Sequence, residues 1–135
     1  FTADKLSAAF ATAADAEVVL FGEGYGEKIQ KGGGSYRKGV SYRLFDVLVG
    51  PWWLELDAVA DVAAKLGIQV VPPLGQIDRL PDGTLDLKGI VEQSLVALQD
   101  GGDGCTAEGV VARTSPILCT RRGDRLMWKL KFKDF

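Results

Sequence analysis

The last stretch of the chain alternates between apolar and basic residues. From position 128 to position 133 the apolar residues are Trp128, Leu130 and Phe132, and the basic residues are Lys129, Lys131 and Lys133. Successive side chains of a strand point to opposite faces, so the pattern predicts a strand with one apolar and one cationic face. Three ammonium groups on one face repel one another, at roughly 1 kcal/mol per close pair in water. The cationic face therefore indicates either a half-solvated edge strand whose lysines block aggregation, or a strand across which a polyanion binds.

Apolar spacing predicts the remaining elements. Thr2 can cap an alanine-rich helix that runs to about Ala14, and a second helix is expected from Trp52 to Leu66, closed by Gly67. A third helix is marked by Leu87, Ile90, Val91, Leu95 and Leu98, and a flexible connection is expected over residues 100–104. Strands are expected over residues 17–21, 40–49, 68–71, 109–113 and 126–132, with a turn over residues 121–124. Because strands and helices are interspersed without a regular βαβ rhythm, the sequence predicts an α+β fold in a single domain, residues 1–135.

A glycine-rich segment from Gly22 to Gly34 follows the first strand and is expected to form a loop. It lacks a helix start after its third glycine, which a dinucleotide fold requires, and it lacks the Gly-Lys-Ser/Thr of a phosphate loop. Two interpretations remain: a strand that delivers Glu23 onto a loop where a ligand can approach closely, or a flexible hairpin with Glu23 in solvent.

The segment that begins at Glu108-Gly109 repeats this arrangement, with a glutamate before a glycine at the start of an apolar strand. Two carboxylates at strand ends, a lysine-faced strand and a glycine-rich loop are the components of a metal–triphosphate site. Mg²⁺ takes oxygen ligands and bridges phosphates, while lysines neutralise the remaining charge.

Composition and charge narrow the function further. The chain of 135 residues is 47% hydrophobic, which suffices for one core, and its net charge is −2. Residues 115–135 carry +4, which leaves −6 for the rest and favours a local anion site. Histidine is absent, which excludes histidine-based acid–base chemistry, and Cys105 and Cys119 are expected to be reduced. No apolar run approaches the ~20 residues of a membrane span, so we expect a cytoplasmic protein with no membrane association.

These segments together resemble the motifs of the covalent nucleotidyltransferases, which include ATP-dependent ligases and mRNA capping enzymes. The similarity is to the branch of RNA ligases that seal nicks in duplexes. Similarity to the third motif of this family lies in residues 20–30 (LFGEGYGEKIQ). Similarity to the aromatic-Asp motif that follows it in the family lies in residues 42–47 (YRLFDV). The fourth resembles Glu108-Gly109-Val110-Val111, and the fifth resembles Lys129-Leu130-Lys131. The resemblance implies a nucleotidyltransferase fold of mostly antiparallel sheets with flanking helices.

The resemblance also implies roles for single residues. Phe45 would stack on adenine, Glu23 would contact the ribose, and Glu108 would help to hold Mg²⁺. Lys129 and Lys131 would be catalytic, binding the phosphates of ATP during AMP transfer, and Lys133 is left as a candidate RNA contact. The implied substrates are ATP and RNA with 5′-phosphate and 3′-hydroxyl ends.

The family's first motif, Lys-x-Asp-Gly, does not occur in the sequence. Its lysine attacks the α-phosphate of ATP and carries the AMP. We therefore expect this motif in a segment that precedes Phe1, so that the chain is the C-terminal portion of an adenylyltransferase domain, incomplete at its N-terminus. Two alternatives stay open: a catalytically inactive nucleotide- or RNA-binding module, and a DNA ligase fragment, which the Ile29-Gln30 pair disfavours.

Overall fold

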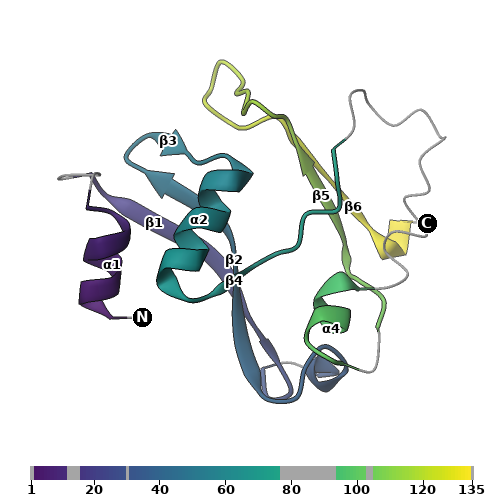
Figure 1. Cartoon of the computed structure of the whole chain (residues 1–135). Coiled ribbons are helices and arrows are strands. Elements are labelled where there is room, and N and C mark those ends of the chain that lie inside the picture. Colours follow the sequence, from purple (N-terminus) through teal and green to yellow (C-terminus); the bar gives the residue numbers. More distant parts are fainter. Residues whose placement is uncertain (1, 12–15, 30, 77–93, 103–104, 135) are drawn as a thin grey trace.

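The computed structural model describes residues 2–11, 16–29, 31–76, 94–102 and 105–134. Its fold is α+β, as the sequence predicts (Figure 1). The helices are α1 (Ala3–Ala9), α2 (Leu56–Leu66) and α4 (Leu95–Gln99), with 3₁₀ turns η1 (Gly33–Ser35) and η2 (Phe132–Asp134). The strands are β1 (Val18–Gly26), β2 (Val40–Val49), β3 (Trp52–Trp53), β4 (Gln69–Val70), β5 (Gly109–Arg113) and β6 (Met127–Lys131). Of the expected third helix, Leu87, Ile90 and Val91 lie outside the described residues.

The predicted cap of the first helix and the predicted end of the second helix are both confirmed. Not all the predicted bounds of these helices are correct. Thr2 caps α1 by accepting a hydrogen bond from the Lys5 amide, and Gly67 ends α2 in the left-handed conformation at φ 69°. The prediction that Trp52 begins the second helix was wrong. Trp52 pairs with Val49 in a tight β2–β3 hairpin, where its side chain is 74% exposed.

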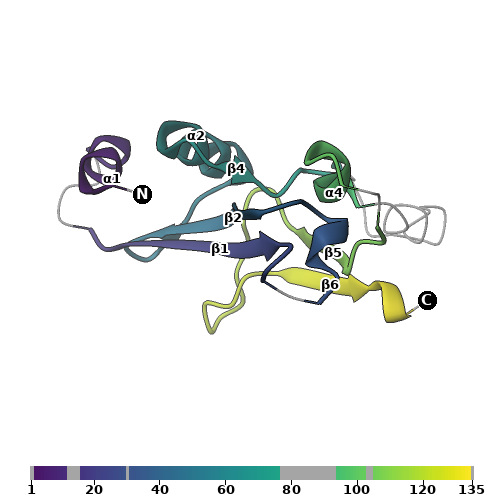
Figure 2. The ribbon, with the colours of Figure 1, turned by 90° about the horizontal axis from the view of Figure 1, so that it is seen from below.

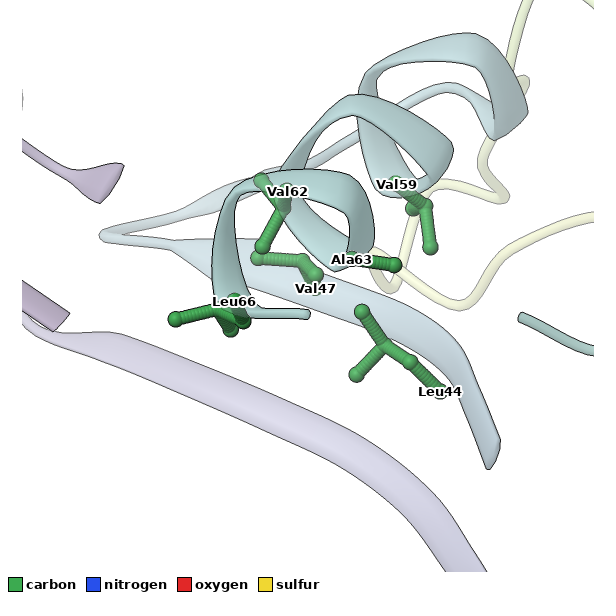
Figure 3. Packing of buried hydrophobic residues seen from close by; sticks show 6 residues of the cluster. All are labelled: Leu44, Val47, Val59, Val62, Ala63 and Leu66. Carbon is green, nitrogen blue, oxygen red and sulfur yellow. The ribbon is translucent and has the colours of Figure 1, made fainter. Parts of the chain in front are cut away.

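A four-stranded sheet carries the core of the molecule. β1 and β3 pair antiparallel with β2, whereas β4 pairs parallel with it. Helix α2 covers one face of this sheet with its apolar stripe, which meets two fully buried residues of β2, Leu44 and Val47 (Figure 3). The core cluster consists of Leu44, Val47, Val59, Val62, Ala63 and Leu66.

Strand β2 contains a bulge at Phe45. Phe21 pairs with Asp46 and Gly22 pairs with Leu44, so Phe45 is an extra residue with no partner in β1. The extra residue changes the strict two-residue alternation of faces. As a result Leu44 and Val47, three positions apart, both point toward α2.

The glycine-rich segment differs from its prediction as a loop. Gly22, Gly24 and Gly26 are strand residues, because β1 continues in register with β2 as far as the Gly26–Val40 pair. A Cβ on Gly22 would overlap the ring of Tyr42. Here glycine permits close packing between neighbouring strands, whereas the sequence interpretation assigned that close approach to a ligand.

The second sheet is the two-stranded antiparallel hairpin β5–β6. Figure 2 shows β6 on the side of β1–β2 opposite to α1 and α2. Trp128 and Leu130 are half-buried and Lys129 is exposed, which confirms the predicted alternation over these three residues, whereas Lys131 is half-buried like Leu130. The strand ends at Lys131, however, and Lys133 lies in the 3₁₀ turn η2. The prediction that all three lysines share one strand face was therefore wrong for Lys133.

Candidate functional site

Phe45 is displayed on the surface by the bulge that contains it. Its neighbour Leu44 is fully buried, whereas Phe45 is 38% exposed, so these two successive residues lie on different sides of the strand. The Phe45 carbonyl oxygen accepts a hydrogen bond of 3.1 Å from Arg113 Nη2. This contact fixes the bulge and leaves an aromatic ring open to a flat ligand.

Glu23 lies within β1, paired in register with Arg43, and its side chain is exposed. Neither sequence interpretation, a ligand loop or a flexible hairpin, placed Glu23 inside a regular strand. The negative charge of its carboxylate raises the pKa of the Tyr36 hydroxyl, and Glu108, the residue before β5, has the same effect. The negative charges of the two predicted carboxylates thus both act on one tyrosine, although they are 85 positions apart in the sequence.

Tyr36 is a residue of this region that the sequence analysis missed. Its hydroxyl donates a hydrogen bond of 3.3 Å to the Thr106 carbonyl oxygen. Burial raises the pKa of Tyr36 above 10.0, and Cys105 and the negative charges of Glu108 and Glu23 raise it further. Tyr36 therefore stays a neutral hydrogen-bonding group at neutral pH. No motif signals it, because its position follows from the fold alone.

Glu108 and Lys131 form an ion pair at the open end of the β5–β6 hairpin. Lys131 Nζ lies 3.2 Å from Glu108 Oε1, and the Glu108 carbonyl oxygen accepts a hydrogen bond from the Phe132 amide. The two side chains border an open hollow of about 340 Å³, which is lined by Thr106, Ala107, Glu108, Lys131, Phe132 and Lys133. A carboxylate beside two ammonium groups suits an anion that carries a divalent cation.

The structure brings some of the predicted site residues to this hollow and leaves others apart from it. Lys131 and Lys133 line it, whereas Lys129 pairs with Val111 in the middle of the hairpin and is exposed. Phe45 and Glu23 do not line it. A ligand that contacted all the predicted residues would have to extend from β2 of the larger sheet to the end of the β5–β6 hairpin.

A buried carboxylate, Asp46, joins the two sheets. Asp46 binds Arg113 and Arg125, and Arg125 also lies over Trp53. Arg125 Nη1 and Nη2 bind Asp46 Oδ1 and Oδ2 at 2.9 and 3.1 Å, and Arg113 Nη1 also donates to Oδ1. The Arg125 guanidinium carbon lies 3.6 Å from the centroid of the Trp53 ring. Sequence alone assigned Asp46 to a motif and gave it no role; its partners are 67 and 79 positions away.

A second buried carboxylate, Asp100, corrects another prediction. The sequence predicts a flexible connection over residues 100–104, yet the Asp100 side chain is only 2% exposed and forms an ion pair of 3.1 Å with Arg43. The Tyr25 hydroxyl also donates to Asp100, and Arg43 Nη1 bonds Gln99 and the Val70 carbonyl oxygen. This network attaches α4 to the ends of β1 and β2. Glu23 lies on β1.

The donor set fits magnesium, although it contains no preformed metal centre. Within the ranges that the structure describes, no group of three or more Asp, Glu, Cys or His side chains could hold a metal ion. Mg²⁺ usually binds one or two protein carboxylates and takes its other ligands from phosphates and water. Glu108, whose side chain is 74% exposed at the rim of the hollow, meets that requirement. Cys105 and Cys119 are not joined in a disulfide.

Fold and site together define an α+β domain with a hollow bordered by lysines and a carboxylate at the end of its second sheet. The RNA ligase family matches residues 2–131, and the chain belongs to this family. No curated protein and no solved structure matches the chain. Among the helices of the described residues, none is long and apolar enough to cross a membrane. Family membership implies RNA as the substrate.

Proposed function

We propose that the chain supplies the nucleotide, metal and phosphate contacts of an ATP-dependent RNA ligase. The observation that carries the proposal is the Lys131–Glu108 pair at 3.2 Å, on a hairpin whose neighbouring lysines extend the positive charge. Lys129 and Lys131 would bind the phosphates of ATP, and Glu108 would hold Mg²⁺, which neutralises phosphate charge. Phe45 would stack on adenine, and Glu23 would contact the ribose.

The proposed reaction has three steps. A lysine of the ligase attacks the α-phosphate of ATP, which forms a phosphoramidate to AMP and releases pyrophosphate. The AMP then passes to the 5′-phosphate of an RNA end, and a 3′-hydroxyl attacks that end and releases AMP. Lys129 and Lys131 stabilise the charge that develops on the reacting phosphates. The nucleophile would come from a Lys-x-Asp-Gly motif, which the 135 residues do not contain.

The first test is binding. We expect ATP with Mg²⁺ to shift the backbone amide resonances of Phe45, Glu108, Lys129 and Lys131 in nuclear magnetic resonance spectra of the chain. Shifts confined to other parts of the chain, or no shifts at millimolar ATP, would contradict the proposal. With labelled ATP, no lysine of the chain should acquire a covalent AMP, because none is followed by the Asp-Gly of the first motif.

The second test separates a ligase from an inactive binding module. A 5′-adenylylated RNA already carries its AMP, so sealing it to a 3′-hydroxyl needs no lysine nucleophile. We expect a mixture of this chain and a separate polypeptide with the Lys-x-Asp-Gly motif to seal such an RNA and also to transfer AMP from ATP. Binding of ATP and RNA without either reaction would favour the inactive module.

A further inference from the structure

The proposed ATP site is divided between two sheets. Phe45 belongs to β2 of the four-stranded sheet, whereas Lys129 and Lys131 belong to β6 of the hairpin. A nucleotide that stacks on Phe45 and places its phosphates against the lysines must therefore contact both sheets at once. Its affinity depends on the angle and offset between them.

Arg125 is placed to set that angle. Its two terminal nitrogens bind the two oxygens of Asp46, which follows Phe45 directly, and its guanidinium plane lies over the indole of Trp53. Trp53 in turn contacts Phe21 of β1, with the ring centroids 5.2 Å apart. Arg125 thus connects the segment that leads into β6 with three strands of the other sheet.

The contact requires an arginine. A bidentate bond to a carboxylate fixes direction as well as distance, and only a planar guanidinium can make it while stacking on an aromatic ring. The Asp46 side chain is only 10% exposed and that of Arg125 only 11%, so solvent screens this pair weakly. Arg113 supplies a second cation to Asp46, and for this reason the carboxylate keeps a charged partner if Arg125 is replaced.

A small change in the direction of the strand at Arg125 produces a large displacement of the lysines further along it. Lys129 and Lys131 follow Arg125 by four and six positions, and a strand advances about 3.3 Å per residue, which places them roughly 13 and 20 Å away. A tilt of about 3° at Arg125 would then move Lys131 by about 1 Å. A displacement of that size at a reacting group can cost on the order of a hundredfold in rate.

We propose that Arg125 is a positioning residue for nucleotide binding, which holds lysine-bearing β6 at a fixed angle to Phe45-bearing β2 through Asp46 and Trp53. The inference rests on the proposed function, because it assumes that one ATP molecule contacts both sheets. Arg125 itself touches neither the base nor the phosphates in this arrangement.

The test compares Arg125→Lys with Arg121→Lys, a matched control on the exposed turn that precedes β6. The first measurement needs no nucleotide: residual dipolar couplings of backbone amides report the relative orientation of β1–β2 and β5–β6. In the parent and in Arg121→Lys, one alignment tensor should fit both sheets. In Arg125→Lys each sheet should still fit its own geometry, and no single tensor should fit both. A single tensor in Arg125→Lys would overturn the proposal.

The second measurement compares the binding of ATP with the binding of two fragments of it. Adenosine probes the Phe45 surface and tripolyphosphate probes the lysines, whereas ATP needs both. Arg125→Lys should weaken ATP binding about tenfold or more and change the binding of either fragment less than twofold, since only ATP depends on the offset between the sheets. Equal ATP affinity in parent and variant would overturn the positioning role. If the parent bound neither ATP nor the fragments, the proposed function would fail, and the dipolar couplings would still show whether Arg125 fixes the sheets.

A third variant tests the stacking of Arg125 on Trp53. Trp53→Leu removes the ring face under Arg125 and retains an apolar side chain against Phe21. It should reproduce the orientational effect of Arg125→Lys, with both sheets still giving native-like spectra. If Trp53→Leu left the orientation unchanged while Arg125→Lys altered it, the stacking part of the proposal would be rejected.

Discussion

Lys131 and Glu108 neutralise each other across 3.2 Å at the end of the hairpin. An incoming phosphate competes with Glu108 for the ammonium group, and an incoming cation competes with Lys131 for the carboxylate. A phosphate–cation pair therefore replaces one ion pair by two. Binding of either ion should favour binding of the other.

Glu108→Gln tests this coupling. We expect the variant to bind metal-free tripolyphosphate more tightly, by about 1.5- to 5-fold, because an exposed ion pair worth roughly 0.2–1 kcal/mol no longer has to be broken. Added Mg²⁺ should then strengthen ATP binding less than in the parent. Calorimetric titrations with and without Mg²⁺ measure both effects. A response to Mg²⁺ identical to that of the parent would reduce Glu108 to an exposed strand-end carboxylate.

Phe45→Ala tests the adenine surface. Loss of base stacking, worth ~1–3 kcal/mol, should weaken ATP binding by roughly 5- to 150-fold. The melting temperature should change little, since the Phe45 side chain is partly exposed and lies outside the core cluster. Trp52→Ala is a suitable control, because it removes an even more exposed aromatic side chain from a different strand. Unchanged ATP affinity in Phe45→Ala would remove the stacking role.

The three lysines form a graded series. In a ligase reconstituted with a Lys-x-Asp-Gly segment, alanine at Lys129 or Lys131 should abolish or strongly reduce AMP transfer, because each stabilises charge on the reacting phosphates. Lys133→Ala should chiefly weaken RNA binding and reduce the salt slope by about 1. Gel-based transfer assays and salt titrations of RNA binding distinguish these outcomes. Equal and mild effects at all three positions would support the aggregation-blocking edge strand.

Gly109→Ala tests the reason for the glycine after Glu108. A Cβ at this position would overlap the Leu130 carbonyl oxygen and lie 2.9 Å from the Lys131 Cα, both backbone atoms of β6. The substitution should destabilise the fold by about 1–3 kcal/mol, as overpacking does, and should alter amide shifts along the hairpin. Gly34→Ala is the control, since its nearest contact would be the flexible Glu27 side chain at 3.7 Å. Equal melting temperatures for both variants would contradict this explanation.

Cys105 should react with iodoacetamide more slowly than Cys119 at pH 9. Burial raises the pKa of the Cys105 thiol above 9.0, and the hydrogen bond with Tyr36, which lowers it, is the smaller effect. The thiolate form of Cys105, which is the reactive form, is therefore scarcer than in a thiol with the ordinary pKa, and the Cys105 side chain is half-buried, whereas Cys119 is exposed. Mass spectrometry of the labelled chain, repeated with Cys119→Ser, measures the rates separately. Faster labelling of Cys105 would contradict the packing around Tyr36.

Local patterns predicted the elements well where the signal was local. The cap at Thr2, the helix end at Gly67 and the alternation through Trp128, Lys129 and Leu130 depend on neighbouring residues, and the structure confirms them. The strand from Gly22 to Gly26 was missed, because glycine is unfavourable in isolated strands and pairing with β2 overrides that preference.

The candidate site was predicted in parts, without its connections. Motif order supplied Phe45, Glu108 and Lys131, and the structure adds an ion pair between Glu108 and Lys131 that the sequence does not predict. The contacts of Asp46 with Arg113 and Arg125 could not be predicted, since they join residues far apart in sequence. Asp100 was misassigned for the same reason: its burial depends on Arg43, a residue of a distant strand.

The extra residue at position 45 decides which changes in length strand β2 can accept. Deleting Phe45 would leave Leu44 and Asp46 as successive residues opposite Gly22 and Phe21, so strict alternation would return and Leu44 and Val47 would still face α2. A one-residue deletion away from the bulge would instead turn the residues on one side of it to the opposite face. Among RNA ligase sequences, a gap at position 45 should therefore remove the exposed ring and the carbonyl oxygen that binds Arg113, and leave the buried face of β2 in place.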